Sequence, residues 1–441
     1  MIRVRYAPTP SGPLLLSGLR VALFNFLFAC RNKGHALLRF DDLDQAKCPP
    51  SLADQTRQDL RWFGLDWDAE IHQADRAELY QAAIERLKAR NLLYPCFESE
   101  EELRAKQELR RKRRQPLIYD RAMLALTPAQ REAAEAGGKR PYWRMRLSGR
   151  ALAWRDLVLG ERQAKLSAVS DPILVRADGT PAPALASVVD DIDTGITHII
   201  RGEDNAGNTA IQIELFELLT GRASTIRFAH LPALPDNPLT KPGRKVGQLQ
   251  VRGLRADGIE PCALAACITG TKEDRANPPE LPILAAHFDL ATAAAAQFSA
   301  RQMLAVNRRV LARMEFADVA DRLPPGATER FWLAVRGSLD LLREARGWWD
   351  VVAGTIVPPV VEGERELLAQ AETLLPAEPW DQSVWTQWIA ALERATGRFG
   401  ESLLAPLRLA LTGEDTGPDL ADLLPLIGRV RAADRLRIAA A

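Results

Sequence analysis

The chain has 441 residues, of which 47% are hydrophobic and 26% charged, and its formal net charge is +1 at pH 7. This length allows about two to four domains with cores of their own, and no apolar run approaches the ~20 residues that would span a bilayer. The near-neutral net charge does not decide whether the protein binds nucleic acid, because a neutral protein can still gather positive charge on one part of its surface. The five cysteines are too scattered for a disulfide framework, so a cytoplasmic protein without a membrane segment is expected.

The first elements in the chain are typical of a βαβ unit. Ile2, Val4 and Tyr6 alternate with polar residues, which predicts a half-buried strand. The apolar stretch 18–31 predicts a helix, and residues 36–40 predict a second strand. A strand, helix and strand in this order predict a parallel sheet with a right-handed crossover.

Ligands of a parallel sheet bind beyond the carboxyl ends of its strands, which here are residues 7–17 and 41–44. The chain has neither GxGxxG nor GxxxxGK[ST] at this place, so a dinucleotide fold or a P-loop is not expected. Prolines and Gly12 bend the loop. The helix that follows presents its N-terminal N–H groups, which are a ready site for phosphate.

Helices are predicted over 51–63 and 77–92. A mixed segment, 95–185, then interrupts the sheet domain and splits it into two halves. Residues 186–205 are interpreted as a strand, an acidic turn and a strand, and a helix is predicted over about 206–219.

Within the inserted segment, residues 98–114 place acidic residues first and basic residues last, which complements a helix dipole. Two interpretations remain open for this helix. It is either an ordinary solvated charged helix or a strip that faces phosphates.

After about residue 310 strand signals largely vanish, and a helical region is predicted. Trp380, Val384, Trp388 and Leu392 form an apolar stripe at helical spacing, which favours a core. The pair Trp348 and Trp349 favours core packing as well, with a partner surface as the alternative.

Six segments in chain order resemble motifs of bacterial class I glutamyl-tRNA synthetases. They are RYAPTPSGPLLLSG at 5–18, RFDDLD at 39–44, FGLDWDAE at 63–70, VVDDIDTGITHIIRGED at 188–204, FAHLP at 228–232 and PLRLALTGEDTGPDL at 406–420. The resemblance covers essentially the whole chain. It implies an α/β fold in which a Rossmann-like parallel-sheet catalytic domain is split by an acceptor-binding insertion and followed by an all-helical anticodon-binding region.

The resemblance also implies how the chain is divided. Residues 1–94 and 186–235 would form the catalytic domain, 95–185 the inserted domain that binds the tRNA acceptor, 236–310 a mobile ATP-binding loop and a stem-contact region, and 311–441 the anticodon-binding region.

The family's reaction is the adenylation of L-glutamate by ATP with Mg²⁺, followed by transfer to the 3′ end of tRNA(Glu), and a monomer is expected from the resemblance. By the same resemblance, the glutamate-binding residues are Arg5, Asp41 and Arg201. The ATP-binding residues are Pro10, Gly12, Ser17, Gly18 and Arg244, and the catalytic cations are Lys241 and Arg244.

Several positions depart from the family pattern. Leu15 stands where the first signature has a histidine, Ser17 replaces a glycine, and Pro183 stands where a tyrosine is expected near the substrate. Losing one hydrogen-bond donor that acts in the transition state typically lowers a rate by ~10²–10³. We therefore expect this chain to resemble the family more closely in its fold than in the residues that carry out the reaction.

The zinc knob of many relatives is also incomplete. Cys96 is followed by Glu98 instead of a second cysteine, and Met123 stands where another would be, although Tyr119 remains. Four soft ligands cannot be assembled, so no structural zinc is expected.

Three functions remain open at this point. The chain is a working glutamate–tRNA ligase, a degraded paralogue that binds tRNA or regulates without aminoacylation, or a repurposed ligase that adenylates another amino acid. The anticodon-type C-terminal region favours tRNA over a free small-molecule acceptor.

Overall fold

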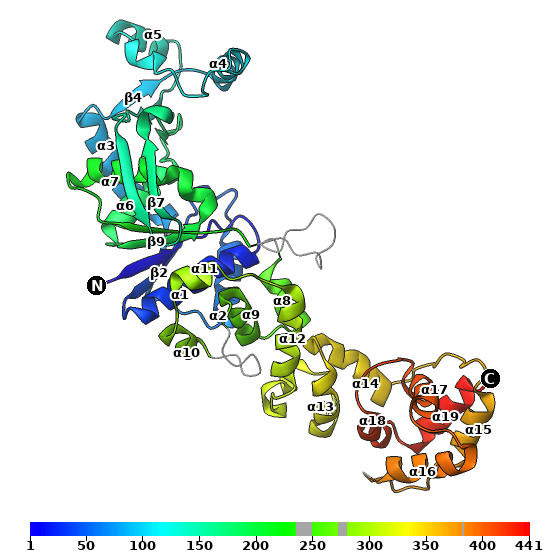
Figure 1. Cartoon of the computed structure of the whole chain (residues 1–441). Coiled ribbons are helices and arrows are strands. Elements are labelled where there is room, and N and C mark those ends of the chain that lie inside the picture. The colour runs from blue at the N-terminus through cyan, green and yellow to red at the C-terminus, as the bar shows by residue number, and fades with distance from the viewer. Residues whose placement is uncertain (235–248, 272–279, 382) are drawn as a thin grey trace. The chain divides into compact units, whose positions relative to one another are not determined.

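The computed structural model describes residues 1–234, 249–271, 280–381 and 383–441, whose path is drawn in Figure 1. The chain divides into two compact units. The first consists of Met1–Arg252, Ile268–Thr271 and Pro279–Phe298, and the second of Gly253–Cys267, Lys272–Pro278 and Ser299–Ala441.

The first unit begins with the βαβ arrangement predicted from the sequence. Strands β1 (Arg3–Tyr6), β2 (His35–Phe40) and β3 (Ala69–His72) form a parallel sheet in that order. Helix α1 (Leu16–Arg31) connects the first two strands and buries apolar side chains. The predicted parallel pairing of the first two strands is confirmed.

A second sheet has the order β7-β6-β10-β9. Strand β10 (Arg227–Leu231) pairs in parallel with β9 (His198–Gly202) on one side, in a register that places His230 opposite Arg201, and in parallel with β6 on the other. Strands β6 (Ala151–Asp156) and β7 (Gly160–Lys165) form an antiparallel ribbon from the inserted segment, and Asp156 pairs with Phe228 of β10. The insertion therefore supplies strands to the same sheet as β9. The N–H of Thr197 donates to the Arg3 carbonyl at 2.9 Å, which joins this sheet to β1.

The third sheet is antiparallel and belongs to the insertion. Its order is β4 (Leu93–Cys96), β5 (Tyr142–Met145) and β8 (Ile173–Val175). Helix α4 (Glu100–Lys112) covers most of the acid-to-base stretch 98–114, as predicted. It begins with a capping box, in which Ser99 and Glu102 each bond to the other's backbone N–H.

One sequence prediction is wrong. Residues from 186 were interpreted as a strand followed by an acidic turn, but α6 (Pro183–Asp193) is a helix. Neighbouring valines suggested a strand, and the two carboxylates after them suggested an exposed turn. In the fold, Asp190 and Asp191 are buried at 0% and 2% exposure, because arginines and other donors from elsewhere in the chain satisfy them.

The remaining helices of the first unit are α2 (Pro50–Trp62), α3 (Ala77–Ala89), α5 (Pro128–Ala136), α7 (Thr209–Thr220), α10 (Leu281–Ala286) and α11 (Leu290–Ala294). Helices α2, α3 and α7 agree with the helices predicted for those parts of the sequence. The boundary between the units passes through α8 (Val251–Asp257) and α9 (Pro261–Thr269).

The second unit is helical over its described residues, and no strand occurs in them. Its helices include α12 (Ala300–Leu311), α13 (Glu329–Val335), α14 (Ala345–Ala353), α15 (Arg365–Thr373), α16 (Val384–Thr396), α17 (Glu401–Thr412), α18 (Leu420–Ile427) and α19 (Arg429–Ala439). Val384, Trp388 and Leu392 are buried in its core, as the apolar stripe predicted. Trp348 and Trp349 pack against that core. Among the described residues of the whole chain, no helix has the length and apolar character needed to cross a membrane.

Candidate active site

Two adjoining cavities open where β1 and β9 end. The larger has a volume of about 690 Å³ and the smaller about 490 Å³. The two cavities share the lining residues Tyr6, Ala7, Val21, Arg201 and Asn205. They lie at the carboxyl ends of parallel strands, which is where the sequence analysis placed the ligand site.

The smaller cavity has a charged wall. Arg5, Arg39, Asp41 and Arg201 line it, and Asp191 of α6 pairs with two of them. Arg5 donates from Nε to Asp191 Oδ1 at 3.0 Å, and Arg39 donates from Nη1 to the same oxygen at 2.9 Å. Asp190 also lies 3.8 Å from Arg39 Nε, but neither Asp190 nor Asp191 lines the cavity. Three guanidinium groups and the one carboxylate of Asp41 therefore line the wall, which suits an acidic ligand.

Asp41 supplies a carboxylate to this cavity, but it already accepts hydrogen bonds from Arg39. The donors are Arg39 Nε at 2.7 Å and Nη2 at 3.3 Å. Burial raises the pKa of Asp41 and outweighs the opposing effect of Arg39 and Arg5. The side chain is 22% exposed, so part of the carboxylate remains accessible to an ammonium group in the cavity.

Arg201 is held by hydrogen bonds on nearly every side. It donates from Nε to His230 Nε2 at 3.1 Å, from Nη1 to Gln212 at 2.7 Å, and from Nη2 to Thr209 Oγ1 at 3.0 Å and the Asn205 carbonyl at 3.1 Å. These bonds use all but one of the N–H groups of a guanidinium. Burial, and then the charge of nearby Arg5, lower the pKa of Arg201 to about 10. Arg201 is therefore a fixed cation with one N–H left for a ligand.

His230 connects Arg201 to the inserted segment. Because its Nε2 accepts from Arg201, its Nδ1 carries the proton and donates to Asp156 Oδ2 at 2.5 Å. Asp156 also accepts from the backbone N–H groups of Val158 and Leu159. Burial by itself would raise the pKa of Asp156, but the hydrogen bonds from His230, Leu159 and Val158 lower it. The hydrogen bonds from His230 to Asp156 and from Arg201 to His230 thus orient the Arg201 guanidinium in the site.

The larger cavity lies at the start of α1, where Ser17 and Gly18 line it. The first N–H groups of a helix have no partner within the helix, and they favour a phosphate. The N–H of Leu16 donates to the Leu249 carbonyl at 2.8 Å, so the N–H groups of Ser17 and Gly18 are the ones offered to a ligand here. A Cβ on Gly18 would lie 2.9 Å from Tyr6 Oη. The glycine therefore allows α1 to approach β1 closely.

Arg20 also lines the larger cavity, although no sequence motif had pointed to it. It is 3% exposed and donates from Nη2 to the Ala294 carbonyl at 2.8 Å and from Nη1 to the Pro232 carbonyl at 2.5 Å. Burial lowers the pKa of Arg20 to about 10, against the opposing charge of Glu203. The available signal was an arginine between Leu19 and Val21 in the most apolar helix segment of this part of the sequence.

The other residues named from the sequence are divided between the cavities and the rest of the chain. Pro10 and Gly12 line neither cavity, whereas Pro183 lines the smaller one. The predicted catalytic cations, Lys241 and Arg244, lie outside the described residues.

A family model described as "tRNA synthetases class I (E and Q), catalytic domain" matches residues 1–269. The chain belongs to this family. An anticodon binding domain model matches residues 360–440 of this class I synthetase, which agrees with the helical second unit. Enzymes of this class use ATP.

Curated relatives of the synthetase match it over its full length. Glutamate–tRNA ligase 2 of Gluconacetobacter diazotrophicus is 50% identical and covers 100% of both chains. Glutamate–tRNA ligase 2 of Granulibacter bethesdensis is 52% identical over 99% of this chain and 98% of its own length.

Solved structures show the same fold. A glutamate-tRNA synthetase from Elizabethkingia anophelis matches with a TM-score of 0.81 and 22% identity, over 100% of this chain and 99% of the other. A glutamate tRNA ligase from Elizabethkingia meningosepticum, solved in complex with its amino acid, matches with a TM-score of 0.79 and 23% identity over the same shares. The predicted class I α/β architecture with a helical C-terminal region is thereby confirmed.

The zinc site that the resemblance implies does not fit the residues of this synthetase. Tyr119 Oη donates to Glu98 at 2.6 Å, and Lys106 Nζ donates to the same carboxylate at 2.5 Å. The Arg144 guanidinium lies 4.1 Å from the centre of the Tyr119 ring. Burial raises the pKa of the Cys96 thiol to about 11. Two cations and a protonated thiol therefore occupy the place where a metal would need anionic ligands.

Proposed function

We propose that the chain is a glutamate–tRNA ligase. It adenylates L-glutamate with ATP and Mg²⁺ and transfers the glutamyl group to the 3′ end of tRNA(Glu). The observation that carries the proposal is the pair of adjoining cavities that share Arg201, one with a cationic wall and one at a helix N-terminus. The names of the full-length relatives support glutamate as the amino acid.

The smaller cavity is the proposed glutamate site. Arg5 and Arg201 would bind the side-chain carboxylate, and Asp41 would contact the ammonium group. Since Asp191 holds Arg5 and His230 holds Arg201, both guanidinium groups are oriented before the ligand arrives. Less of the binding energy is then spent on ordering the site.

The larger cavity is the proposed ATP site. Ser17 and Gly18 would contact the nucleotide, while Pro10 and Gly12 would shape the loop before them. An oxygen of the α-carboxylate of glutamate attacks the α-phosphorus of ATP, the bond from that phosphorus to the oxygen that bridges it to the β-phosphorus breaks, and pyrophosphate leaves. The side chains of Lys241 and Arg244 would stabilise the charge that develops on the triphosphate. Mg²⁺, when bound with ATP, would supply further positive charge there.

The tRNA is proposed to contact both the insertion and the C-terminal region. Residues 95–185 would bind its acceptor end and 311–441 its anticodon. The anticodon-domain match at 360–440 supports the second assignment. A cytoplasmic monomer is part of the same proposal.

A second candidate function is a protein that binds tRNA without aminoacylating it. Two observations favour it. The side chain of Leu15, which directly precedes α1, cannot donate to phosphate. Pro183 lines the amino-acid cavity, where the family resemblance implies a tyrosine. The repurposed ligase, which would activate another amino acid, has less support because the full-length relatives are named for glutamate.

The deciding experiment is glutamylation of total tRNA with labelled glutamate and ATP, run beside a Leu15→His variant. We expect labelled tRNA from the wild type. No product from the wild type, with partial rescue by Leu15→His, would contradict the working ligase. tRNA binding without product in either protein would support the second candidate.

A further inference from the structure

The peptide bond between Pro232 and Ala233 is held at both of its polar ends by charged side chains. Arg20 donates from Nη1 to the Pro232 carbonyl at 2.5 Å, and Glu203 Oε1 accepts from the Ala233 N–H at 3.0 Å. This peptide bond is trans, so its C=O and N–H lie in one plane and point in roughly opposite directions. Hydrogen bonds to charged groups are about twice as strong as neutral ones. The peptide therefore cannot rotate without breaking two strong bonds.

Packing does not explain why this peptide is held. Ala233 is exposed, so its own side chain contributes little to the core. Arg20, by contrast, is 3% exposed, and its hydrogen bonds go to the backbone carbonyls of Pro232 and Ala294. Removing a guanidinium from water has a cost in solvation. A buried cation that holds an exposed peptide indicates that the direction of that peptide has a function.

The held peptide belongs to the wall of the larger cavity, which residues 231–234 line together with Ser17 and Gly18. With the phosphates at the N-terminus of α1, the base of the nucleotide must contact other parts of this wall. Leu231 and Leu234 are buried and offer apolar surface, and the next peptide along the chain offers the Ala233 carbonyl and the Leu234 N–H. A purine has flat apolar faces and an edge with donors and acceptors, which matches such a wall.

We propose that Arg20 and Glu203 are positioning residues for nucleotide recognition. By fixing the peptide between Pro232 and Ala233, they fix the direction in which the next peptide presents its carbonyl and N–H to the edge of the base. The ring of Pro232 also fixes its own φ angle, so the held peptide is restrained from the preceding side as well. The inference rests on the proposed function, because it takes the larger cavity as the ATP site.

The test compares, by calorimetry on the full-length protein, the affinity for ATP with the affinity for purine riboside triphosphate, which lacks the amino group at the edge of the base. We expect the wild type to prefer ATP. Glu203→Ala releases the Ala233 N–H and should lower this preference about 2- to 10-fold, the range for one hydrogen bond. Glu203→Gln keeps an oxygen that accepts from the same N–H, so it should retain most of the preference.

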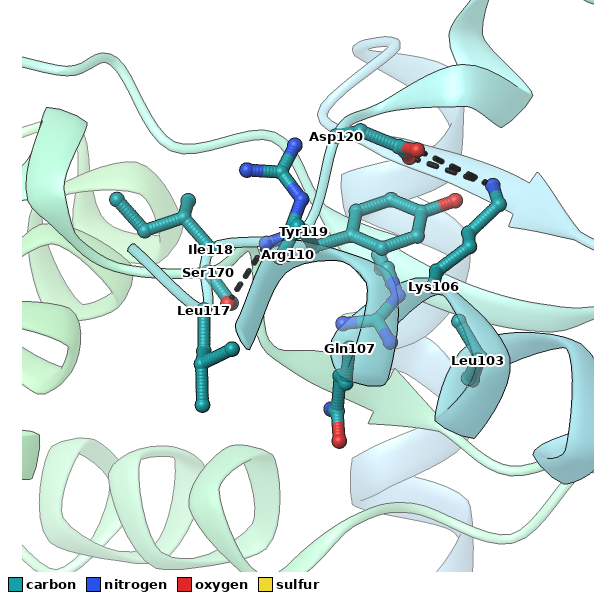
Figure 2. A pocket seen from close by; sticks show the side chains of 10 residues that line it. Leu103, Lys106, Gln107, Arg110, Leu117, Ile118, Tyr119, Asp120 and Ser170 are labelled. Carbon is teal, nitrogen blue, oxygen red and sulfur yellow. Dashed lines mark hydrogen bonds and ion pairs between the residues drawn. The ribbon is translucent and has the colours of Figure 1, made fainter. Parts of the chain in front are cut away.

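Asp120 provides a matched control for Glu203. It is also an exposed carboxylate, and it accepts from the backbone N–H of Ala122 at 3.1 Å. It lies 3.2 Å from the cation of Lys106 (Figure 2), as Glu203 lies near that of Arg20. Asp120 lines neither cavity of the proposed active site, so Asp120→Ala should leave the preference for ATP unchanged. An equal drop in Glu203→Ala and Asp120→Ala would overturn the inference.

A second pair of variants separates a role of Arg20 in recognition from a role in stability. Arg435 is the matched residue, since it is 3% exposed and donates to the backbone carbonyls of Leu411 at 2.7 Å and Val351 at 2.6 Å. Arg20→Met and Arg435→Met should both lower the urea midpoint, because each removes hydrogen bonds of a buried cation. Only Arg20→Met should lower the preference for ATP. A preference that stays unchanged in Arg20→Met and Glu203→Ala would contradict the positioning role.

Glutamylation assays distinguish this result from a failure of the proposed function. In the active enzyme, Glu203→Ala should raise the KM for ATP and leave the KM for glutamate unchanged, and an equal rise in both would overturn the positioning role. A wild type that binds ATP but forms no glutamyl-tRNA would overturn the ligase alone, since the affinities of the variants would still decide the role of Arg20 and Glu203. A wild type that binds no ATP would overturn both.

Discussion

Replacing Asp156 by asparagine should disturb Arg201 through His230. Asp156 Oδ1 accepts the backbone N–H groups of Val158 at 3.0 Å and Leu159 at 2.9 Å, and Oδ2 accepts His230 Nδ1–H. The asparagine oxygen must stay with the backbone N–H groups, so its NH₂ group replaces Oδ2. An NH₂ donor there requires His230 to accept at Nδ1, which moves the proton to Nε2.

In that tautomer His230 and Arg201 direct N–H groups at each other across 3.1 Å. Arg201 then loses a hydrogen bond that involves a charged group, worth about 1.5–3 kcal/mol, which corresponds to roughly 10- to 150-fold in affinity. We expect Asp156→Asn to raise the KM for glutamate in tRNA glutamylation by a factor in this range. The KM for ATP should change much less.

The chain offers a matched control for this exchange. Asp42 accepts the Ala74 N–H at 2.9 Å through Oδ1 and pairs with His72 Nδ1 at 2.6 Å through Oδ2. Neither Asp42 nor His72 lines either cavity of the site. Asp42→Asn therefore makes the same chemical change away from the ligand. An unchanged KM for glutamate in Asp156→Asn, or an equal rise in both variants, would refute the reasoning.

Three further outcomes concern stability. Burial opposes the charged form of His72, but the hydrogen bond and charge of Asp42 outweigh it, so the pKa of His72 is raised above 6.5. The stabilisation of the folded state by the Asp42–His72 pair is then complete below pH 6.5 and is lost as the pH rises through the raised pKa. The difference in urea midpoint between wild type and Asp42→Asn should therefore shrink over that rise. A difference that stays constant with pH would contradict this. A chelator should leave the melting temperature unchanged, because Glu98 is held by Tyr119 and Lys106 instead of by a metal. Glu98→Gln should destabilise the fold by about 1–3 kcal/mol in thermal unfolding. A drop in melting temperature on adding a chelator would contradict this account of Glu98. A Cβ at Gly417 would overlap the Trp348 ring, so Gly417→Ala should destabilise the fold by about 1–3 kcal/mol in urea unfolding, and an unchanged midpoint would show that Trp348 moves freely.

Local pattern was enough to predict most elements of the first unit. Strand β1 corresponds to the alternation of Ile2, Val4 and Tyr6, and α1 to the apolar stretch after Gly18. Both could be predicted because the periodicity of a strand or a helix depends only on residues that are close in the sequence. The exception is α6. Arg5 and Arg39 reach Asp191 from other elements. Asp190 accepts from Gln73, Arg76 and Tyr80. Both carboxylates are stable in a buried helix only because of these distant partners, and nothing local in the sequence reports them.

The candidate site divides in the same way. Motif resemblance singled out Arg5, Asp41 and Arg201, which line one cavity. It did not single out Asp156, which is 74 residues from His230 in the chain and meets it only through the pairing of β6 with β10.

By itself, the sequence determined the family, the order of the main elements and the charged residues available to the site, since each is carried by short contiguous segments. Only the tertiary structure decided which charges are already committed to protein partners. The physical reason is that a guanidinium's capacity for a ligand depends on the hydrogen bonds it has left. Those are set by residues that the fold brings together from distant parts of the chain.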